Sequence, residues 1–441
     1  MFNATSEPVK MPLAFSVDGI PVNCQFSAVM DGHLGIIGFI FDKRNATINI
    51  YLITLSSADL SPVGKPKLLV SFPGSTDGAF SVARSENNKV VSFIAFPESD
   101  KDDHFVPFAF CINERFEVMW SKPLTKFEED GMHAVQNQSV SDAGDVCFLA
   151  TKEPSFFNIL SHAPSYTNVE LLTIRDMGTS VHSVPIALQA KVIIEMQCAF
   201  DKNGFIICTG FYSDDFVDFN YTGKCAMRVD ANGNQIIQAV TQPFSDTDAF
   251  YFSKASATPY GADKGAFRMH KIWIQPDGGF ILIAEKILIV IEYASNVNGN
   301  AIVNNIYYYQ NIFVERVAPD FSIVWSRMIP KNQVTNEDKG YYSSYSVIEK
   351  QDVLYFFFND NPENIGLLYG IKAEPMTPGN AVPVYVSISK SGELMKGMLD
   401  GPQATKTIFC PRIFGDMDNG NAFLYGEKGR TYQIGSISFP K

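Results

Sequence analysis

Glu285 is the residue best placed for chemistry in this sequence, because it ends the apolar run Phe280–Ala284 and is followed by Lys286. A carboxylate at the end of a strand, close to the axis of a ring of sheets, could bind a ligand or act as a general acid. The alternative is a strand-end charge that reaches water. Both interpretations place Glu285 where its strand stops.

Two groups of tyrosines could form a binding surface, because aromatic rings stack on sugars and grip peptides. The first group runs from Tyr307 to Tyr309, and the second contains Tyr341, Tyr342 and Tyr345. Their alternative role is packing in the core or at the rim of the fold. The predicted binding residues are therefore Glu285, Tyr307, Tyr341 and Tyr342.

No established catalytic motif is present in the sequence. It contains no P-loop, no dinucleotide-binding glycine motif, no nucleophile elbow and no HExxH zinc motif. The six histidines are far apart and could meet only through folding. The segment Asp416–Glu427 is spaced like a calcium loop, but Asn421 stands where the invariant glycine belongs, so a plain hairpin turn is expected. We expect no catalytic residue, no metal and no cofactor.

Cysteine spacing points to buried thiols and not to a metal site. The seven cysteines form no CxxC pair and no zinc pattern, and most lie in apolar runs. Cys198 and Cys208 flank one tight turn. Simple hairpin register sets Cys198 opposite Ile207, which argues against a disulfide between the two cysteines.

Charge and hydropathy limit the partners. A net charge of −12 without a basic patch argues against nucleic acid and anionic lipid. The longest apolar run, Phe280–Ala294, contains three charged residues and is too short to span a bilayer. Met1–Lys10 is polar and lacks the apolar region of a signal peptide. The expected partner is another protein or a glycan, and the location is the cytoplasm or, for a processed chain, the periplasm or cell surface.

The elements that position these residues are predicted from a repeat. Residues 108–121 (FAFCINERFEVMWS) return as residues 313–326 (FVERVAPDFSIVWS). Seven dense apolar runs follow polar turns, with starts 54 to 75 residues apart. The runs are continuous and not alternating, which indicates strands buried on both faces. A ring of stacked antiparallel sheets gives every strand that environment, so the repeat predicts a β-propeller.

We therefore predict an all-β protein whose residues 1–441 form a single propeller of seven blades, each with about four antiparallel strands. The last blade is short, and a strand at Met11–Val17 is expected to complete it and close the ring. Three polar insertions, at Asp246–Gly265, Ala294–Asn305 and Asn359–Asn380, are expected to be surface loops. The predicted blades are 17–75, 76–130, 131–188, 189–262, 263–335, 336–402 and 403–441 with the N-terminal strand.

Trp120 and Trp325 are predicted to occupy equivalent, buried positions in different blades. Each follows a Phe by four residues and an aliphatic residue by two, a spacing that a strand would place on one face. Truncation of Trp325 to Ala is expected to lower the free energy of unfolding by roughly 3–5 kcal/mol. An unchanged denaturation midpoint would show that the side chain is not in the core. The two triplets are Phe116, Val118, Trp120 and Phe321, Ile323, Trp325.

Several turn and strand motifs carry a family resemblance: Gly210–Asp214, Asp277–Glu285, Ile323–Trp325 and Phe358–Asp360. Over roughly residues 190–365 the chain resembles uncharacterised β-propeller-like proteins of Bacteroidetes-type bacteria. The resemblance implies a cell-envelope or exported protein without known catalysis.

The function expected from the sequence is thus a non-catalytic binding or scaffold module, a protein–protein interaction component of the bacterial cell envelope. The alternative is a glycan-active hydrolase or lyase with carboxylates at the propeller axis. Because a fold does not determine a function, the alternative requires two carboxylates, or a histidine and a carboxylate, that converge near the axis. A lining of backbone and apolar groups would exclude it.

Overall fold

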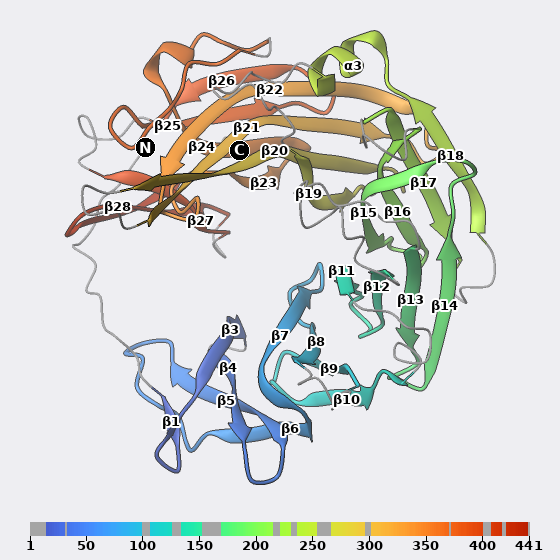
Figure 1. The fold of residues 1–441 in the computed structure, drawn as a ribbon, viewed down its shortest axis with the longest axis vertical. Helices are drawn as coiled ribbons and strands as arrows, with labels where there is room; N and C mark the ends of the chain where they lie inside the picture. The colour runs from blue at the N-terminus through green and yellow to red at the C-terminus, as the bar shows by residue number, and fades with distance from the viewer. Residues whose placement is uncertain are drawn as a thin grey trace.

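The structure is a computed structural model and consists almost entirely of strands (Figure 1). No helix in the described residues is long and apolar enough to cross a membrane. The described residues are 15–30, 33–98, 106–125, 134–151, 169–214, 221–230, 236–253, 266–295, 301–369, 372–399, 407–416 and 420–439.

The described strands form antiparallel sheets that follow one another along the chain, and within each sheet the strands pair in chain order. We number the sheets as blades 1 to 7. Blade 1 contains β3 (Asn23–Met30), β4 (His33–Asp42), β5 (Thr47–Ser56) and β6 (Lys67–Pro73). Blade 2 contains β7 (Ser75–Arg84), β8 (Val91–Glu98), β9 (Phe108–Ile112) and β10 (Val118–Pro123). Blade 3 contains β11 (Ala134–Val140), β12 (Val146–Thr151), β13 (Val169–Arg175) and β14 (Ser180–Ile186).

The second half of the chain continues the series. Blade 4 contains β15 (Val192–Phe200), β16 (Ile206–Ser213), β17 (Gly223–Val229) and β18 (Ile236–Pro243). Blade 5 contains β19 (Ala266–Ile274), β20 (Phe280–Ser295), β21 (Ala301–Val317) and β22 (Ile323–Asn336). Blade 6 contains β23 (Ser346–Lys350), β24 (Val353–Asp360), β25 (Val382–Ile388) and β26 (Leu394–Met398). Blade 7 contains β27 (Ile408–Asp416), β28 (Ala422–Lys428) and β29 (Thr431–Ile437).

The blades stand around a centre, with the first strand of each blade inside and the last strand outside (Figure 1). The inner strands of neighbouring blades contact one another, as β7 does with β11, β11 with β15 and β15 with β19. Side chains on these inner strands are therefore the ones that a ligand at the axis would meet. The predicted all-β propeller of stacked antiparallel sheets is confirmed.

Apolar side chains fill the space between each pair of neighbouring blades. In β20, Phe280 and Leu282 pack toward blade 4, whereas Ile281 and Ile283 pack toward blade 6. Each fully buried side chain of this size contributes about 1.5–3 kcal/mol relative to exposure. Because successive residues of one strand enter two different apolar clusters, the apolar runs of the sequence are continuous and do not alternate.

Ring closure differs from the prediction. Ser16 and Val17 form the short strand β1 (Ser16–Val17), which pairs with β2 (Ile20–Pro21) and not with blade 7. Asp18 and Gly19 adopt positive φ angles of 50° and 79°, which gives a tight hairpin that uses the hydrogen-bonding groups of β1 locally. Residues 11–14 lie outside the described residues. The described strands do not show a closed ring, and the single domain and blade limits predicted above remain predictions.

The predicted loop Asp246–Gly265 begins with a helix, α3 (Asp246–Ser253). The Ser245 hydroxyl accepts a hydrogen bond from the Asp248 N–H at 3.1 Å and caps the helix. Phe252 anchors α3 in the apolar cluster between blades 4 and 5. The helix was missed because the eight-residue segment has almost no apolar periodicity. Residues 254–265 lie outside the described residues.

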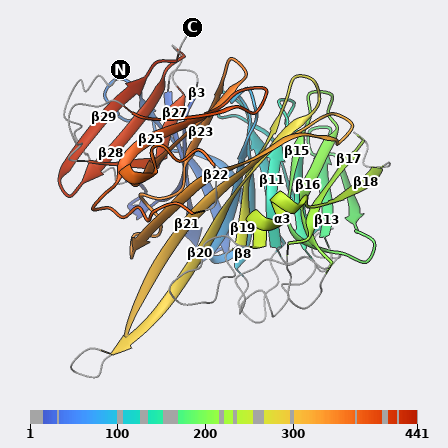
Figure 2. The same ribbon diagram turned by 90° about the horizontal axis from the view of Figure 1, so that it is seen from above.

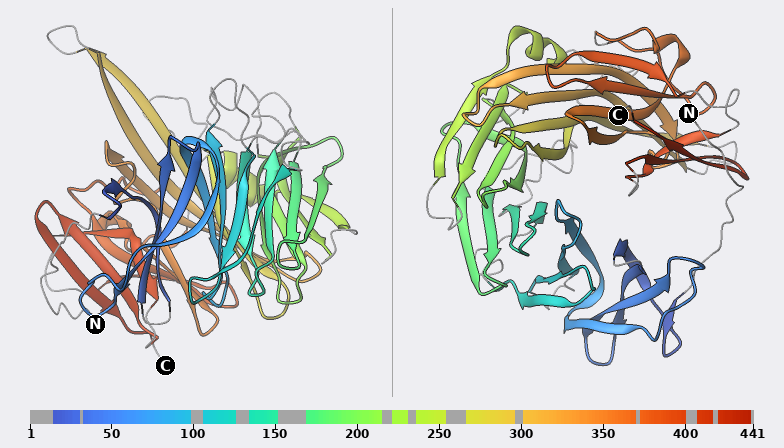
Figure 3. Two further views of the ribbon diagram at one scale, coloured as in Figure 1. Left: turned by 90° about the horizontal axis from the view of Figure 1, so that it is seen from below. Right: turned by 180° about the vertical axis from the view of Figure 1, so that it is seen from behind.

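The predicted loop Ala294–Asn305 lies largely within strands. β20 continues to Ser295 and β21 starts at Ala301, and together they form a hairpin that projects far beyond the ring (Figures 2 and 3). In the third insertion, β24 ends at Asp360 and a short 3-10 helix, η1 (Pro362–Asn364), follows. The polarity of residues 294–305 suggested a loop, whereas residues 294–295 belong to β20 and residues 301–305 to β21; residues 296–300 lie outside the described residues.

Trp120 on β10 and Trp325 on β22 occupy equivalent positions, as predicted. Both lie on the outermost strand of their blade and are 7% exposed. Each indole Nε1–H donates to a backbone carbonyl of the next blade, at 2.9 Å to Gly144 and 3.0 Å to Lys390. The basic residues that follow also donate to the next blade: Lys122 to the Gly178 carbonyl and Arg327 to the Gly392 carbonyl.

The predicted shared face of the two triplets is wrong. Phe116 packs in the cluster between blades 1 and 2, whereas Trp120 packs between blades 2 and 3. Phe321 and Trp325 are likewise divided between two clusters. Phe116 and Phe321 adopt positive φ angles of 57° and 68° in the turns, and the register shifts before each Trp. The period of two that a regular strand requires is therefore interrupted.

The cysteine register also differs by one residue from the prediction. Cys198 on β15 lies directly opposite Cys208 on β16, not opposite Ile207. The two thiols are free, and Cys198 Sγ lies 3.7 Å from Cys147 Sγ. Burial raises the pKa of the Cys198 thiol well above its ordinary value. This position is therefore apolar packing between blades 3 and 4.

Candidate functional site

Inner strands of several blades contain a β-bulge, and two of these bulges lie beside ionisable residues. In β19 the register passes from Met269 opposite Ala284 to Lys271 opposite Ile283, so His270 is the extra residue. In β15 the register passes from Ile193 to Glu195 in the same way, so Glu195 directly follows the bulge. A bulge turns a side chain out of the regular alternation of a strand. These bulges place His270 and Glu195 on neighbouring inner strands.

His270 is held by the carboxylate of Glu285. The His270 Nε2 atom lies 3.4 Å from Glu285 Oε2, and Ser344 Oγ donates to the same oxygen at 2.6 Å. The imidazole stacks on the Tyr345 ring, with centroids 4.9 Å apart and planes 19° apart. Glu285 is fully buried, whereas the His270 side chain is 32% exposed. His270 is therefore the group of this pair that a ligand can reach.

Lys331 on β22 completes the buried charges around Glu285. Its Nζ lies 2.6 Å from Glu285 Oε1 and also donates to the Tyr309 carbonyl at 3.0 Å and to Gln333 Oε1 at 2.8 Å. Both side chains of the ion pair are inaccessible to solvent. The Glu285 carboxylate is thus held at Oε1 by the ion pair with Lys331 and at Oε2 by Ser344 and His270.

Glu195 on β15 contacts the two residues of β19 that directly precede His270. Arg268 Nη1 is 3.4 Å from Glu195 Oε2, and the Met269 N–H donates to the Glu195 carboxylate. Glu195 is largely buried, but the Arg268 side chain is 40% exposed. Three consecutive residues of β19 thus connect the two glutamates, since Arg268 and Met269 contact Glu195 and His270 contacts Glu285.

The two glutamates have pKa values shifted in opposite directions. Burial raises the pKa of Glu195 to about 7, against the opposing effects of Arg268, the Met269 N–H and His270. Burial alone would raise the pKa of Glu285 too, but Lys331 and His270 outweigh it and hold that pKa below its ordinary value. Near neutral pH, Glu195 therefore carries a proton in a large fraction of molecules while Glu285 is ionised. Two carboxyl groups whose pKa values are shifted in opposite directions are typical of acid–base sites.

The sequence placed Glu285 at the end of a strand, and this is wrong, because β20 continues to Ser295 and the residue is buried. Tyr307 lies on β21 five residues from Ile312, the residue opposite Glu285, which corresponds to about 16 Å along the strand. Tyr341 and Tyr342 contact each other edge to face at 5.0 Å in the segment before β23. Asn359 Nδ2 donates to the Tyr342 carbonyl at 2.8 Å, which fixes the segment that also carries Ser344.

The structure therefore brings Glu285 together with His270, Lys331, Ser344 and Tyr345, and not with Tyr307. The binding role predicted for Tyr307, Tyr341 and Tyr342 remains a proposal. Glu195, His270 and Lys331 were missed by the sequence reasoning. A charged residue inside an apolar run, as in Val192–Met196 around Glu195, was the one signal that pointed to a buried functional carboxylate.

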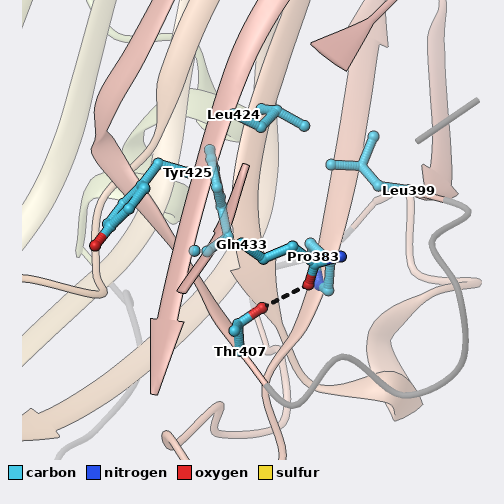
Figure 4. Close-up of a pocket in the computed structure, with 8 residues that line it drawn as sticks. Pro383, Leu399, Thr407, Leu424, Tyr425 and Gln433 are labelled. Carbon is cyan, nitrogen blue, oxygen red and sulfur yellow. Dashed lines mark hydrogen bonds between the residues drawn. The ribbon is translucent and has the colours of Figure 1, made fainter. Parts of the chain in front are cut away.

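A separate cavity lies between blades 6 and 7, away from these ionisable groups (Figure 4). Its walls are mainly apolar, and Thr407 Oγ1 donates to Gln433 Oε1 at 2.9 Å across it. It is a packing gap between two sheets, and its lining contains no carboxylate, histidine, lysine or arginine. The residues labelled in the figure are Pro383, Leu399, Thr407, Leu424, Tyr425 and Gln433.

Comparison with known proteins finds similarity at the level of fold. No family model and no curated protein sequence matches the chain. An α-L-arabinofuranosidase from Fusarium graminearum, solved with arabinobiose, is 10% identical with a TM-score of 0.34, over 82% of this chain and 95% of that chain. The β-propeller domain of a protease from Pyrococcus furiosus is 9% identical with a TM-score of 0.30, over 82% and 93% of the two chains. A thermostable family-43 glycoside hydrolase is 10% identical with a TM-score of 0.27, over 69% and 88%.

These similarities correct the function expected from the sequence. The similar structures include glycoside hydrolases, which contradicts the expectation of a non-catalytic binding or scaffold module of the cell envelope. The antiparallel sheets of this chain agree with the propeller part of the family resemblance, whereas its bacterial family stays a prediction. At this level of identity the likeness concerns the fold, so the chemistry has to be argued from the residues of this chain.

Proposed function

We propose that this protein is a glycan hydrolase whose acid–base groups lie on the inner strands of blades 4 and 5. The observation that carries the proposal is the pairing of a carboxyl group held largely neutral, Glu195, with a His–carboxylate pair, His270 and Glu285, across one short stretch of β19. Glycoside hydrolysis needs a proton donor for the leaving oxygen and a base for the attacking water.

In this proposal Glu195 is the general acid. Its proton goes to the glycosidic oxygen as the bond between that oxygen and the anomeric carbon breaks. The partly exposed Arg268, 3.4 Å from Glu195, is placed to bind sugar hydroxyl groups next to that oxygen. The buried site around Glu195 keeps the carboxyl protonated at a pH where an exposed glutamate would be ionised.

His270 is the general base. It accepts a proton from the water whose oxygen forms the new bond to the anomeric carbon, and Glu285 stabilises the imidazolium that results. The proton then returns from His270 to Glu195 through solvent, which restores the starting state. Lys331 and Ser344 are positioning residues, because they fix Glu285 and touch neither the sugar nor the water.

The proposal is tested by incubating the purified chain with a panel of arabinan, xylan, galactan and uronic-acid oligosaccharides and measuring released reducing ends. We expect hydrolysis of at least one of these oligosaccharides by the parent chain. The His270→Asn variant should produce no reducing ends from that oligosaccharide. Asn keeps a polar side chain at the bulge but cannot accept the proton. If none of the oligosaccharides is cleaved, or if His270→Asn cleaves as fast as the parent chain, the proposed hydrolase function is wrong.

A further inference from the structure

A bulge in the inner strand of blade 7 presents an arginine. In β27 the four residues Cys410–Ile413 stand opposite a single residue of β28, Tyr425. Such a bulge turns side chains out of the regular alternation of the strand, and the Arg412 side chain is exposed. β27 contacts β23, the inner strand of blade 6. Arg412 is therefore accessible to a ligand that approaches the inner strands.

Arg412 is held in place by residues of other blades. Its Nη2 group donates to the Tyr309 hydroxyl of blade 5 at 3.2 Å and to the Lys339 carbonyl, ahead of blade 6, at 3.1 Å. The Tyr309 ring packs so closely on Gly340 that a Cβ atom there would lie 2.5 Å from it. Because the guanidinium is positioned before a ligand arrives, less conformational entropy is lost on binding.

Tyr309 also connects Arg412 to the proposed catalytic groups. The Tyr309 carbonyl accepts a hydrogen bond from Lys331 at 3.0 Å, and Lys331 pairs with Glu285 at 2.6 Å. Burial raises the pKa of the Tyr309 hydroxyl, Arg412 lowers it and Glu285 raises it further. Tyr309 therefore lies between Arg412 and the carboxylate that supports His270. Arg412 thus belongs to the same neighbourhood of the inner strands as His270.

The charge of Arg412 is not matched by a carboxylate. The other two cations of the site, Lys331 and Arg268, are paired with glutamates. Among the residues that the structure describes, Arg412 has only its two neutral acceptors, and its Nε and Nη1 groups have no hydrogen-bond partner. The carboxylate of Asp338, which precedes Lys339, accepts three hydrogen bonds within its own turn. A fixed cation with free N–H donors is suited to bind a carboxylate.

We infer, on the basis of the glycan-hydrolase function proposed above, that Arg412 recognises the carboxylate of an acidic sugar and that the substrate is a glycan containing uronic acid. The Nε and Nη1 groups of Arg412 donate charge-assisted hydrogen bonds to that carboxylate. A neutral sugar, or a uronic acid methyl ester, leaves the charge of Arg412 unmatched. The chain as a whole has a net charge of −12 and repels acidic glycans, so a preference for the acid over its ester must come from a local cation.

Calorimetric titration measures this recognition without turnover. The His270→Asn chain is titrated at neutral pH with trigalacturonic acid and trimannuronic acid, and with the methyl ester of each. We expect at least one acid to bind about tenfold more tightly than its ester. Addition of Arg412→Met should remove this difference and leave the affinity for the ester unchanged. Arg430→Met is the matched control, because it removes the same charge from an exposed position between β28 and β29 of the same blade. With Arg430→Met the preference for the acid should persist.

Three results would overturn this assignment of Arg412: no binding of either acid, equal affinity for acid and ester, or a preference that survives Arg412→Met. Equal loss of the preference in Arg430→Met would reduce the effect to net charge and overturn it as well. Because Arg412 is exposed, an unchanged melting temperature is expected for its variant and shows that it is folded.

Failure of this recognition is distinguishable from failure of the hydrolase function, because binding and the release of reducing ends are measured separately. Binding of an acid through Arg412 without cleavage by the parent chain would support the recognition and reject the hydrolase. Cleavage of neutral oligosaccharides, with acid and ester bound equally, would support the hydrolase and reject the recognition.

Discussion

Replacement of Glu195 by Gln is expected to lower kcat for glycan hydrolysis by about 10²–10⁴-fold, because it removes the proton donor. Gln is nearly isosteric with the protonated carboxyl group and keeps its contacts with Arg268 and the Met269 N–H region. The expected loss is therefore chemical, with KM changed much less than kcat. Initial rates over a range of oligosaccharide concentrations separate the two parameters.

The pH dependence follows from the same group. A general acid acts only in its protonated form, and the pKa of Glu195 is raised to about 7. Hydrolysis by the parent chain should therefore fall as the pH rises through about 7. The residual activity of Glu195→Gln should lack this falling limb. Measurement of kcat/KM from pH 5 to pH 9 for both proteins decides the point.

A stability measurement distinguishes lost catalysis from lost folding. Because the pKa of Glu195 is higher in the folded chain than in the unfolded chain, ionisation of Glu195 destabilises the fold as the pH rises past the unfolded value. At pH 8, Glu195→Gln should therefore have the same melting temperature as the parent chain, or a higher one. The matched control is Glu315→Gln, which replaces another buried glutamate of raised pKa, beside Lys224 and away from His270. By the same sign it should not lower the melting temperature at pH 8, since Lys224 keeps Asp248 as a partner. It should also keep kcat, and an equal loss of kcat in both variants would contradict the role of Glu195.

The sequence was informative about the fold because its strongest pattern has a direct physical cause. A strand between two sheets is apolar on both faces, so runs such as Phe280–Ala284 are continuous, and one run recurs per blade. Local geometry broke the pattern where backbone angles depart from a regular strand. Phe116 and Phe321 in turns of positive φ could not be assigned to the correct face by counting in twos. The helix α3 depends on a serine cap and one phenylalanine, which leave almost no periodic signal.

The candidate site could not be assembled from the sequence, because its residues come from three different blades, 4, 5 and 6. Glu195 is on β15, His270 on β19, Glu285 on β20 and Ser344 just before β23. A β-bulge lies at His270 in β19 and directly before Glu195 in β15. Because a bulge depends on the register between two strands, the sequence of one strand does not reveal it. Glu285 was singled out as a candidate because it was expected at an exposed strand end, whereas the structure buries it completely.

Replacement of Lys331 by Met is expected to lower the free energy of unfolding by about 3–5 kcal/mol at pH 7.5, because it leaves the buried Glu285 carboxylate without its ammonium partner. Met fills a similar volume, so the cost is one of charge and not of a cavity. The deficit should shrink at low pH. The pKa of Glu285 is lowered in the parent chain, so its ion pair stabilises the fold above the unfolded pKa and this contribution is lost as the pH falls through the folded value. Urea denaturation at pH 7.5 and pH 4 measures both quantities.

The double variant Glu285→Gln/Lys331→Met separates the structural role of the ion pair from its role at the site. Removal of both charges leaves no uncompensated ion, so most of the stability lost in Lys331→Met should return, and in some cases such replacements exceed the parent protein in stability. Hydrolysis should stay low, because a neutral amide beside His270 cannot stabilise the imidazolium that forms when His270 accepts a proton. Recovery of stability without recovery of kcat would show that Glu285 acts through His270. Recovery of both would show that the buried charges only hold the blades together and that the proton-accepting group lies elsewhere.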